Sequence, residues 1–165
     1  MTDREYHQAV DTYSSNAYRF ALSYSSNRPL CEDVVQDAYL ALWEQRERIP
    51  MEKARAYLFT VVYHKLMSAL RHQTVVNHSA VDMAQSQPIH TTPSVEFDLA
   101  DILQRAMQVL PPVQRAILQL RDVEDMSYKE IANTLKLSDQ QVQVYLFRAR
   151  VAMKKQLKLW GYDHA

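Results

Sequence analysis

The side chains best suited to binding chemistry lie on one predicted helix near the end of the sequence, residues 139–157. With a period of about 3.6 residues, one face forms an apolar seam of Val142, Leu146, Ala149, Met153 and Leu157. The outward face carries amide, basic and apolar groups: Gln140, Gln141, Val144, Phe147, Arg148, Val151 and Lys155. Amides can pair with adenine, arginine with guanine or phosphate, and apolar groups with the thymine methyl. We therefore expect this helix to bind DNA in the major groove.

The distribution of charge supports this expectation, although the chain as a whole is neutral. Lys and Arg together number 19, as do Asp and Glu. Between Lys136 and Lys158, however, basic residues outnumber acids, and Asp139 is the only acid in that stretch. A local excess of positive charge on one helix fits contact with phosphates.

The segment that precedes this helix predicts a helix-turn-helix. Ser127 with Glu130 and Ser138 with Gln141 each have the spacing of a capping box, which starts a helix. Two starts so close together require a short helix, a tight turn and a longer helix. Ala132 lies where the two helices must approach. Lys136 falls where the turn usually has a glycine in the left-handed conformation, at a cost of about 1 kcal/mol.

A second candidate surface lies on the predicted helix 30–47. Its core face would carry Val34, Val35, Ala38, Tyr39, Leu42 and Trp43. On the opposite face Leu40 is surrounded by polar and acidic residues: Asp33, Gln36, Asp37, Glu44 and Glu47. This pattern fits either a solvated acidic face with one stray leucine or a docking surface for a basic partner.

A third candidate surface lies on the predicted helix 53–72, which mixes aromatic and basic residues. These are Tyr57, Phe59 and Tyr63 with Arg55, Lys65 and Arg71. Such interleaving suits stacking on unpaired bases together with phosphate pairing. The alternative is a core stripe, which Leu58, Val61, Val62, Leu66 and Leu70 define and which Phe59 would join.

The composition, the helix-breaking and capping residues and an aperiodic segment predict an all-α fold in two small domains. One Gly and six Pro in 165 residues argue against a sandwich or barrel, which needs many turn glycines. Further helices are expected at 3–25, at 94–110 with Ser94 as the cap, and from Pro111-Pro112 to about Arg121. Residues 73–93 have no period and no Lys or Arg, so they read as a flexible linker between domains 1–72 and 94–165.

Other classes of site find little support in the sequence. The single Cys31 excludes an internal disulfide and reads as a buried small residue, with a redox switch as the alternative. The six His residues lack ligand spacing, so no metal and no cofactor are expected. No targeting segment or membrane span is evident, which predicts a soluble cytoplasmic protein. A small helical hydrolase or metalloenzyme is disfavoured because paired carboxylates and metal-binding His residues are missing.

Two segments resemble the conserved regions of a known family. Residues 32–44, EDVVQDAYLALWE, resemble region 2 of bacterial sigma factors. Residues 110–157, from LPPVQRAILQLR through SYKEIANTLKLSDQQVQVYLFRARVAMKKQL, resemble region 4. With only these two regions and a short linker, nearly the whole chain resembles the extracytoplasmic-function (ECF, group IV) sigma-70 family, whose members direct RNA polymerase to promoters and have no catalytic residues.

The resemblance implies three sets of contact residues. For the coiled-coil clamp of the polymerase beta-prime subunit they are Asp33, Gln36, Asp37, Leu40 and Glu44. For the minus-10 promoter element, including capture of a flipped base by loop 48–52, they are Arg48, Met51, His64, Lys65, Ser68 and Arg71. For the minus-35 element they are Gln140, Gln141, Gln143, Val144, Phe147, Arg148 and Lys155. Region 4 would also contact the polymerase beta flap, and a free monomer would be held by an anti-sigma factor.

Two positions depart from the pattern of the family. His64 stands where many members have Asn, and Gln143 stands where many have Lys or Arg. Fewer phosphate contacts at Gln143 should weaken DNA binding and its dependence on salt. The competing hypothesis is a helix-turn-helix regulator that binds operators without polymerase, normally as a dimer, and has no need of the acidic face around Leu40.

Overall fold

The computed structural model describes residues 1–73 and 98–162, and these residues are helical with no β-strand, as the sequence predicts. Residues 74–97, which contain most of the predicted linker and Ser94, lie outside the described part. The longer helices are α1 (Asp3–Leu22), α2 (Arg28–Glu44), α3 (Ala54–Gln73), α4 (Leu99–Met107), α5 (Pro112–Leu118), α6 (Tyr128–Leu135) and α7 (Asp139–Leu159). Two short turns, 3-10 and π-helical, are η1 (Met51–Lys53) and η3 (Gln119–Val123).

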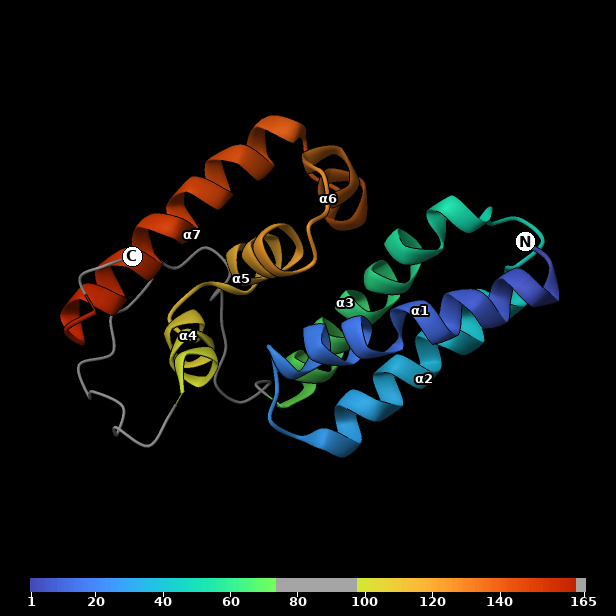
Figure 1. Cartoon of the computed structure of the whole chain (residues 1–165), viewed down its shortest axis with the longest axis horizontal. Helices are drawn as coiled ribbons and strands as arrows, with labels where there is room; N and C mark the ends of the chain where they lie inside the picture. The colour runs from blue at the N-terminus through green and yellow to red at the C-terminus, as the bar shows by residue number, and fades with distance from the viewer. Residues whose placement is uncertain (74–97, 163–165) are drawn as a thin grey trace.

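Helices α1, α2 and α3 form a three-helix bundle, which we call the N-terminal bundle (Figure 1). A capping box of Thr2 and Glu5 starts α1, and the side chain of Asn27 accepts from the Leu30 amide to start α2. The centre of the bundle is fully buried and consists of Phe20, Leu42, Leu58, Phe59 and Leu66. The core stripe predicted for α3 is therefore confirmed at its centre, and Phe59 belongs to it.

Helices α4 to α7 form a second unit, which we call the C-terminal unit, and it contains the predicted helix-turn-helix in α6 and α7. Both capping boxes form, because Ser127 and Ser138 accept from the amides of Glu130 and Gln141, whose side chains accept from the serine amides in return. Lys136 ends α6 in the left-handed conformation, with φ 57° and ψ 48°. The seam predicted for α7 is buried along its whole length.

Several helix boundaries differ from those the sequence predicts, and three of them show why. Helix α4 begins at Leu99 because the side chain of Asp98 accepts from the Asp101 amide. Helix α5 ends at Leu118, where the backbone widens into the π-helical turn η3 instead of continuing to Arg121. Helix α2 ends at Glu44, so Glu47 lies beyond the helix.

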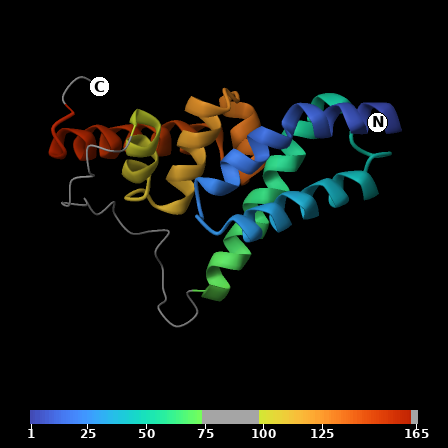
Figure 2. The same cartoon turned by 60° about the horizontal axis from the view of Figure 1, so that its bottom comes forward.

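The N-terminal bundle and the C-terminal unit pack directly against each other, with α6 beside α3 (Figure 2). Arg19 of α1 pairs with Glu124, and Arg55 of α3 pairs with Glu130 of α6. The domain boundaries at 72 and 94 remain a prediction. Within residues 1–73 and 98–162, no helix is both long and apolar enough to cross a lipid bilayer.

Candidate nucleic-acid and partner interfaces

The acidic face of α2 is exposed, and Leu40 lies at its centre. The side chain of Leu40 is 57% exposed, whereas Leu42 on the opposite face is fully buried. All the residues predicted to share this surface are also exposed: Asp33, Gln36, Asp37 and Glu44. The Asp37 carboxylate lies 4.0 Å from the Lys65 ammonium of α3, so the acidic face adjoins the basic surface of the next long helix.

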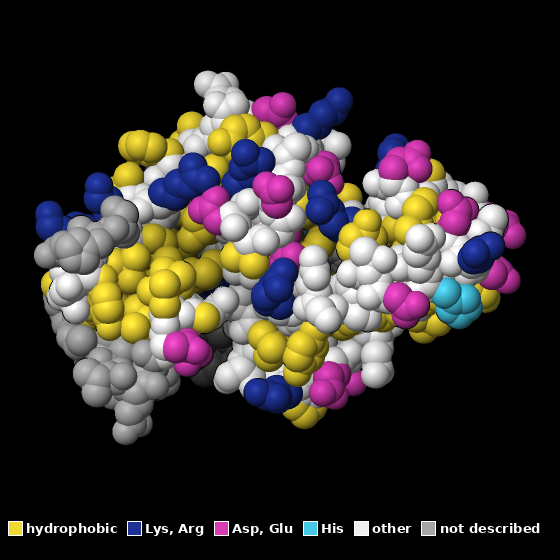
Figure 3. Space-filling view, viewed as in Figure 1, with side chains coloured by type: hydrophobic (Ala, Val, Ile, Leu, Met, Phe, Trp, Pro, Cys, Tyr) yellow, Lys and Arg dark blue, Asp and Glu magenta, His cyan; other side chains and the backbone are white. Residues whose placement is uncertain are grey.

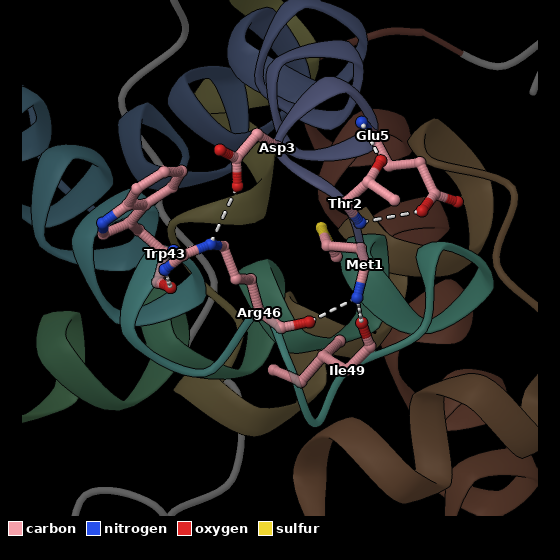
Figure 4. A network of polar contacts seen from close by, with 7 residues as sticks. All are labelled: Met1, Thr2, Asp3, Glu5, Trp43, Arg46 and Ile49. Carbon is pink, nitrogen blue, oxygen red and sulfur yellow. Dashed lines mark hydrogen bonds and ion pairs between the residues drawn. The ribbon is translucent and has the colours of Figure 1, made fainter.

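The loop between α2 and α3 is held by a polar network around the first residues of the chain (Figure 4). The Met1 nitrogen donates to the carbonyls of Arg46 and Ile49. The Arg46 guanidinium pairs with Asp3 at 3.2 Å and stacks on the Trp43 ring at 3.7 Å. The loop that precedes η1 is thus fixed at two points, which leaves the Arg48 side chain exposed and Met51 half-buried.

Helix α3 presents a basic, polar surface to solvent beyond this loop. Four of the predicted DNA contacts lie exposed on it: His64, Lys65, Ser68 and Arg71. The helix offers less aromatic surface for base stacking than the sequence allowed. Phe59 is buried, and the Tyr63 ring packs edge-on against Tyr24, with 6.3 Å between the ring centroids. Contact through charge and hydrogen bonds therefore fits this surface better than extended base stacking.

The outward face of α7 has the exposed apolar groups that the sequence predicts. Phe147 is 69% exposed and Val144 is 41% exposed. The remaining predicted contacts on the helix are exposed as well: Gln140, Gln141, Gln143, Arg148 and Lys155. Gln141 differs from the others because its side-chain oxygen already accepts from the Ser138 amide at 2.9 Å.

A groove of about 510 Å³ between α4, η3 and α7 was not predicted from the sequence. It is apolar, and Figure 3 shows hydrophobic side chains gathered over α4 and α7. Basic residues at its rim are Arg19, Arg150 and Lys154. In its lining Gln119 is buried, and neither polar atom of its amide has a partner among the described residues. In the sequence, Leu99 and Leu103 of the helix α4 could have indicated an exposed apolar surface. The sequence of one short helix does not reveal, however, which elements it packs against.

Cys31 is buried in α2, as predicted, and its thiol lies 3.5 Å from the Ser25 carbonyl. Burial raises the pKa of the thiol, and the nearby Glu32 carboxylate raises it further. A protonated, buried thiol at neutral pH fits the structural interpretation rather than a redox switch.

Comparison with known proteins assigns both halves of the chain to one class. The family model for sigma-70 region 2 matches residues 9–75, and the model for sigma-70 region 4 matches residues 100–153. A similar protein is the ECF RNA polymerase sigma factor SigM of Bacillus subtilis, 27% identical over 86% of this chain and 88% of that protein. SigE of Mycolicibacterium smegmatis, another ECF sigma factor, is 23% identical over 91% of this chain and 60% of its own length.

Solved structures show the same fold. The sigma factor RpoE, in complex with the anti-sigma factor NepR from Bartonella quintana, has a TM-score of 0.74 at 23% identity over 94% of this chain and 98% of that one. CnrH, in complex with the cytosolic domain of CnrY, has a TM-score of 0.69 at 22% identity over 95% of this chain and 90% of that one.

Region 2 followed by region 4 defines a transcription initiation factor that binds DNA and is not an enzyme. The chain belongs to the ECF group of the sigma-70 family. It is an alternative sigma factor that directs promoter recognition, and the regulator hypothesis is not favoured. These comparisons assign the regions and not the individual contact residues.

Proposed function

We propose that this sigma factor binds core RNA polymerase through the exposed acidic face of α2. Leu40 would be the apolar anchor, and Asp33, Gln36, Asp37 and Glu44 would form its polar rim. The observation that carries this proposal is the exposure of Leu40 in the middle of an acidic surface. An apolar side chain ringed by polar contacts is typical of an interface hot spot, and acidic charge would attract a basic clamp.

The proposed minus-10 surface consists of the loop before η1 and the exposed face of α3. Arg48 and Met51 lie by the loop that would receive an unstacked base, and His64, Lys65, Ser68 and Arg71 would line the path of the strand. Five of these six side chains can donate to phosphate or base edges at neutral pH without a change of protonation: Arg48, His64, Lys65, Ser68 and Arg71. Binding energy at this surface would offset the few kcal/mol that local unstacking costs.

The proposed minus-35 surface is the outward face of α7. Phe147 and Val144 would contact thymine methyl groups, Arg148 and Lys155 phosphate or guanine, and the glutamines Gln140 and Gln143 base edges. Gln141 has a smaller share in this surface because its side chain caps α7. The neutral Gln143 should make binding here less sensitive to salt than a Lys or Arg at that position would.

We also propose an anti-sigma factor as a partner, with an amphipathic helix that carries acidic side chains along its edges. The groove between α4, η3 and α7 offers an apolar floor for such a helix. Lys154 supplies positive charge at the rim, where Arg19 and Arg150 also lie, paired with Glu124 and Asp122. Among the similar solved structures, RpoE is bound to the anti-sigma factor NepR, and CnrH is bound to the cytosolic domain of CnrY. In this proposal the protein works in the cytoplasm, where RNA polymerase acts, and the C-terminal unit also meets the beta flap.

The double variant Asp37→Ala with Leu40→Ala tests the polymerase contact. Since both side chains lie on the surface, the fold should be unchanged, and binding to purified core polymerase should fall at least tenfold, equivalent to about 1.4 kcal/mol. The matched control is Asp11→Ala with Leu99→Ala, which removes the same two residue types from exposed positions on α1 and α4.

Affinity for core polymerase would be measured by titration, and helicity by circular dichroism. Wild-type affinity in the α2 variant would contradict the assignment of the acidic face. Equal losses in both variants would show that general surface chemistry, and not Leu40, controls binding. Run-off transcription on a promoter library then connects polymerase binding with promoter choice.

A further inference from the structure

Specific polar contacts join the N-terminal bundle to the C-terminal unit. Arg19 binds Glu124 through two hydrogen bonds, of 2.9 and 3.2 Å, and the Glu124 side chain is completely buried. Arg55 reaches both carboxylate oxygens of Glu130, at 3.0 and 3.3 Å. In addition, the Tyr24 hydroxyl donates to the Pro112 carbonyl. We call the two ion pairs Arg19–Glu124 and Arg55–Glu130 the latch.

The latch places α6 over the loop that we assign to the minus-10 element. A cleft of about 490 Å³ separates the two, with Arg48, Ile49 and Pro50 on one wall and Glu130, Asn133 and Thr134 on the other. A strand of DNA that enters this cleft to deliver a base must pass α6. The proposed base-capture loop therefore faces the helix-turn-helix of the same chain across this cleft.

The same arrangement also prevents simultaneous contact with both promoter elements. Their names place them about 25 base pairs apart, which is roughly 85 Å of B-DNA at about 3.4 Å per pair. A compact chain of 165 residues has a radius of gyration of only about 15 Å. With α3 packed on α6, the minus-10 and minus-35 surfaces lie within one compact body and cannot span that distance.

The interface is built so that it can separate. Polar contacts between units favour relative motion, because water can replace each of them when the units part. The Thr134 hydroxyl is buried at the cleft without a partner among the described residues, so the closed contact is not fully satisfied. Glu130 has a second role, since its carboxylate also accepts from the Ser127 amide and caps α6. Opening would therefore cost the pair with Arg55 but leave the helix-turn-helix intact.

We propose that α6 acts as an intramolecular lid over the minus-10 loop, and that the latch keeps the free sigma factor closed to single-stranded DNA until the two units separate. This proposal rests on the assignment of the minus-10 surface made above. It goes beyond promoter recognition because it gives the free protein a closed state that its own residues stabilise. It requires that the two ion pairs of the latch stabilise the packing of the two units against each other and not the fold of either unit.

The test compares two double variants that change the charge of the C-terminal unit equally. Glu124→Gln with Glu130→Gln removes both acids of the latch, and a Gln at the third helical position can keep the cap of α6, as Gln141 does in α7. Asp122→Asn with Asp125→Asn removes two neighbouring acids, of which Asp122 pairs with Arg150 inside the same unit. All proteins would be full length, with helicity and thermal unfolding checked by circular dichroism.

Two measurements are made on each protein without polymerase. Small-angle X-ray scattering gives the radius of gyration, which should rise by roughly 5 Å or more in the latch variant and stay near the wild-type value in the control. Fluorescence anisotropy with a random 12-nucleotide single strand gives the affinity, which should increase about tenfold in the latch variant, because a larger fraction is competent to bind. High salt should expand the wild-type protein towards the dimensions of the latch variant.

An unchanged radius of gyration in the latch variant would overturn the latch. Expansion without tighter DNA binding would overturn the role of α6 as a lid, and equal changes in the control would assign the effect to net charge. If the latch variant does not fold, Arg19→Gln with Arg55→Gln breaks the same pairs from the other side. Its control is Arg4→Gln with Arg28→Gln, which removes two exposed arginines from the same bundle. Since scattering needs no promoter and no polymerase, its result is independent of the proposed function.

Discussion

Phe147 is the most exposed of the large apolar side chains in the described part of the chain. An aromatic ring in water stabilises nothing in the folded protein, so its contribution is expected in a complex. We predict that Phe147→Ala lowers affinity for minus-35 DNA several-fold to tenfold, on the order of 1 kcal/mol, with an unchanged midpoint of thermal unfolding. Anisotropy with a promoter duplex and a melting curve check the two halves of this prediction.

Leu159→Ala is the matched control for Phe147, since Leu159 is 46% exposed on the same helix but outside the proposed contact set. It should leave DNA binding unchanged. If Phe147→Ala instead destabilises the protein and binds DNA normally, the ring packs against something within the chain. The outward face of α7 would then have to be reassigned.

Single residues were predictable from the sequence where helical geometry decides their environment. A period of 3.6 residues puts Leu40 and Phe147 opposite the buried seams of α2 and α7, and both are exposed. The partners of Arg19 and Arg55 could not be predicted in this way. They pair with acids far away in the sequence, Glu124 and Glu130, and such pairs leave no local pattern.

At the scale of elements, Lys136 is a residue in an unfavourable backbone conformation that the turn between two helices requires. It joins α6 to α7 with φ 57°, a conformation in which its Cβ approaches the following carbonyl. We predict that Lys136→Gly increases the free energy of unfolding by about 1 kcal/mol, because glycine adopts this conformation without that contact. Chemical denaturation with urea measures the change.

Lys136→Ala separates the backbone effect from the effect of charge. Alanine removes the same ammonium group but keeps the Cβ, so it should give little or none of the stabilisation. Equal gains in both variants would show that the lysine charge, and not the left-handed backbone, is unfavourable. DNA affinity measured on both variants reports any phosphate contact that Lys136 makes.

The elements themselves were predicted well where caps and periodicity coincide. The starts of α6 and α7 were correct, because in each a serine and the residue three positions on satisfy two amides that have no partner within the helix. The start of α4 was wrong by several residues because both Ser94 and Asp98 can cap, and composition cannot choose between them. The π-helical turn η3 was missed, since it follows from packing and not from local preference.

At the scale of the whole molecule, the latch gives the closed state a dependence on pH. Burial alone would raise the pKa of the Glu130 carboxyl, but the hydrogen bonds from Arg55 and Ser127 outweigh it, and the pKa lies below its ordinary value. Charged groups that line the same cleft are Arg48, Glu52, Lys53 and Lys129. Because the depressed pKa belongs to the closed state, ionised Glu130 stabilises closure, whereas protonated Glu130 does not.

The sign of the effect fixes the pH range. Above the ordinary carboxyl pKa, about 4.3, the contribution of Glu130 is fully present, and it is lost as pH falls through the lower pKa of the closed state. In the open state Ser127 would still cap α6 and lower the pKa of Glu130. Only the part of the lowering that comes from Arg55 therefore links protonation of Glu130 to opening. We predict a constant radius of gyration from pH 7 to about 5 and expansion below about pH 4.

Scattering and circular dichroism measured together at each pH separate opening from unfolding. In the wild-type protein the radius of gyration should increase while helicity is retained, because the caps and cores within each unit do not depend on the latch. Glu130→Gln cannot ionise at this position, so its expansion should be weaker or already present at pH 7. Expansion that accompanies loss of helicity in both proteins would mean that acid unfolds the units themselves and that Glu130 does not control closure.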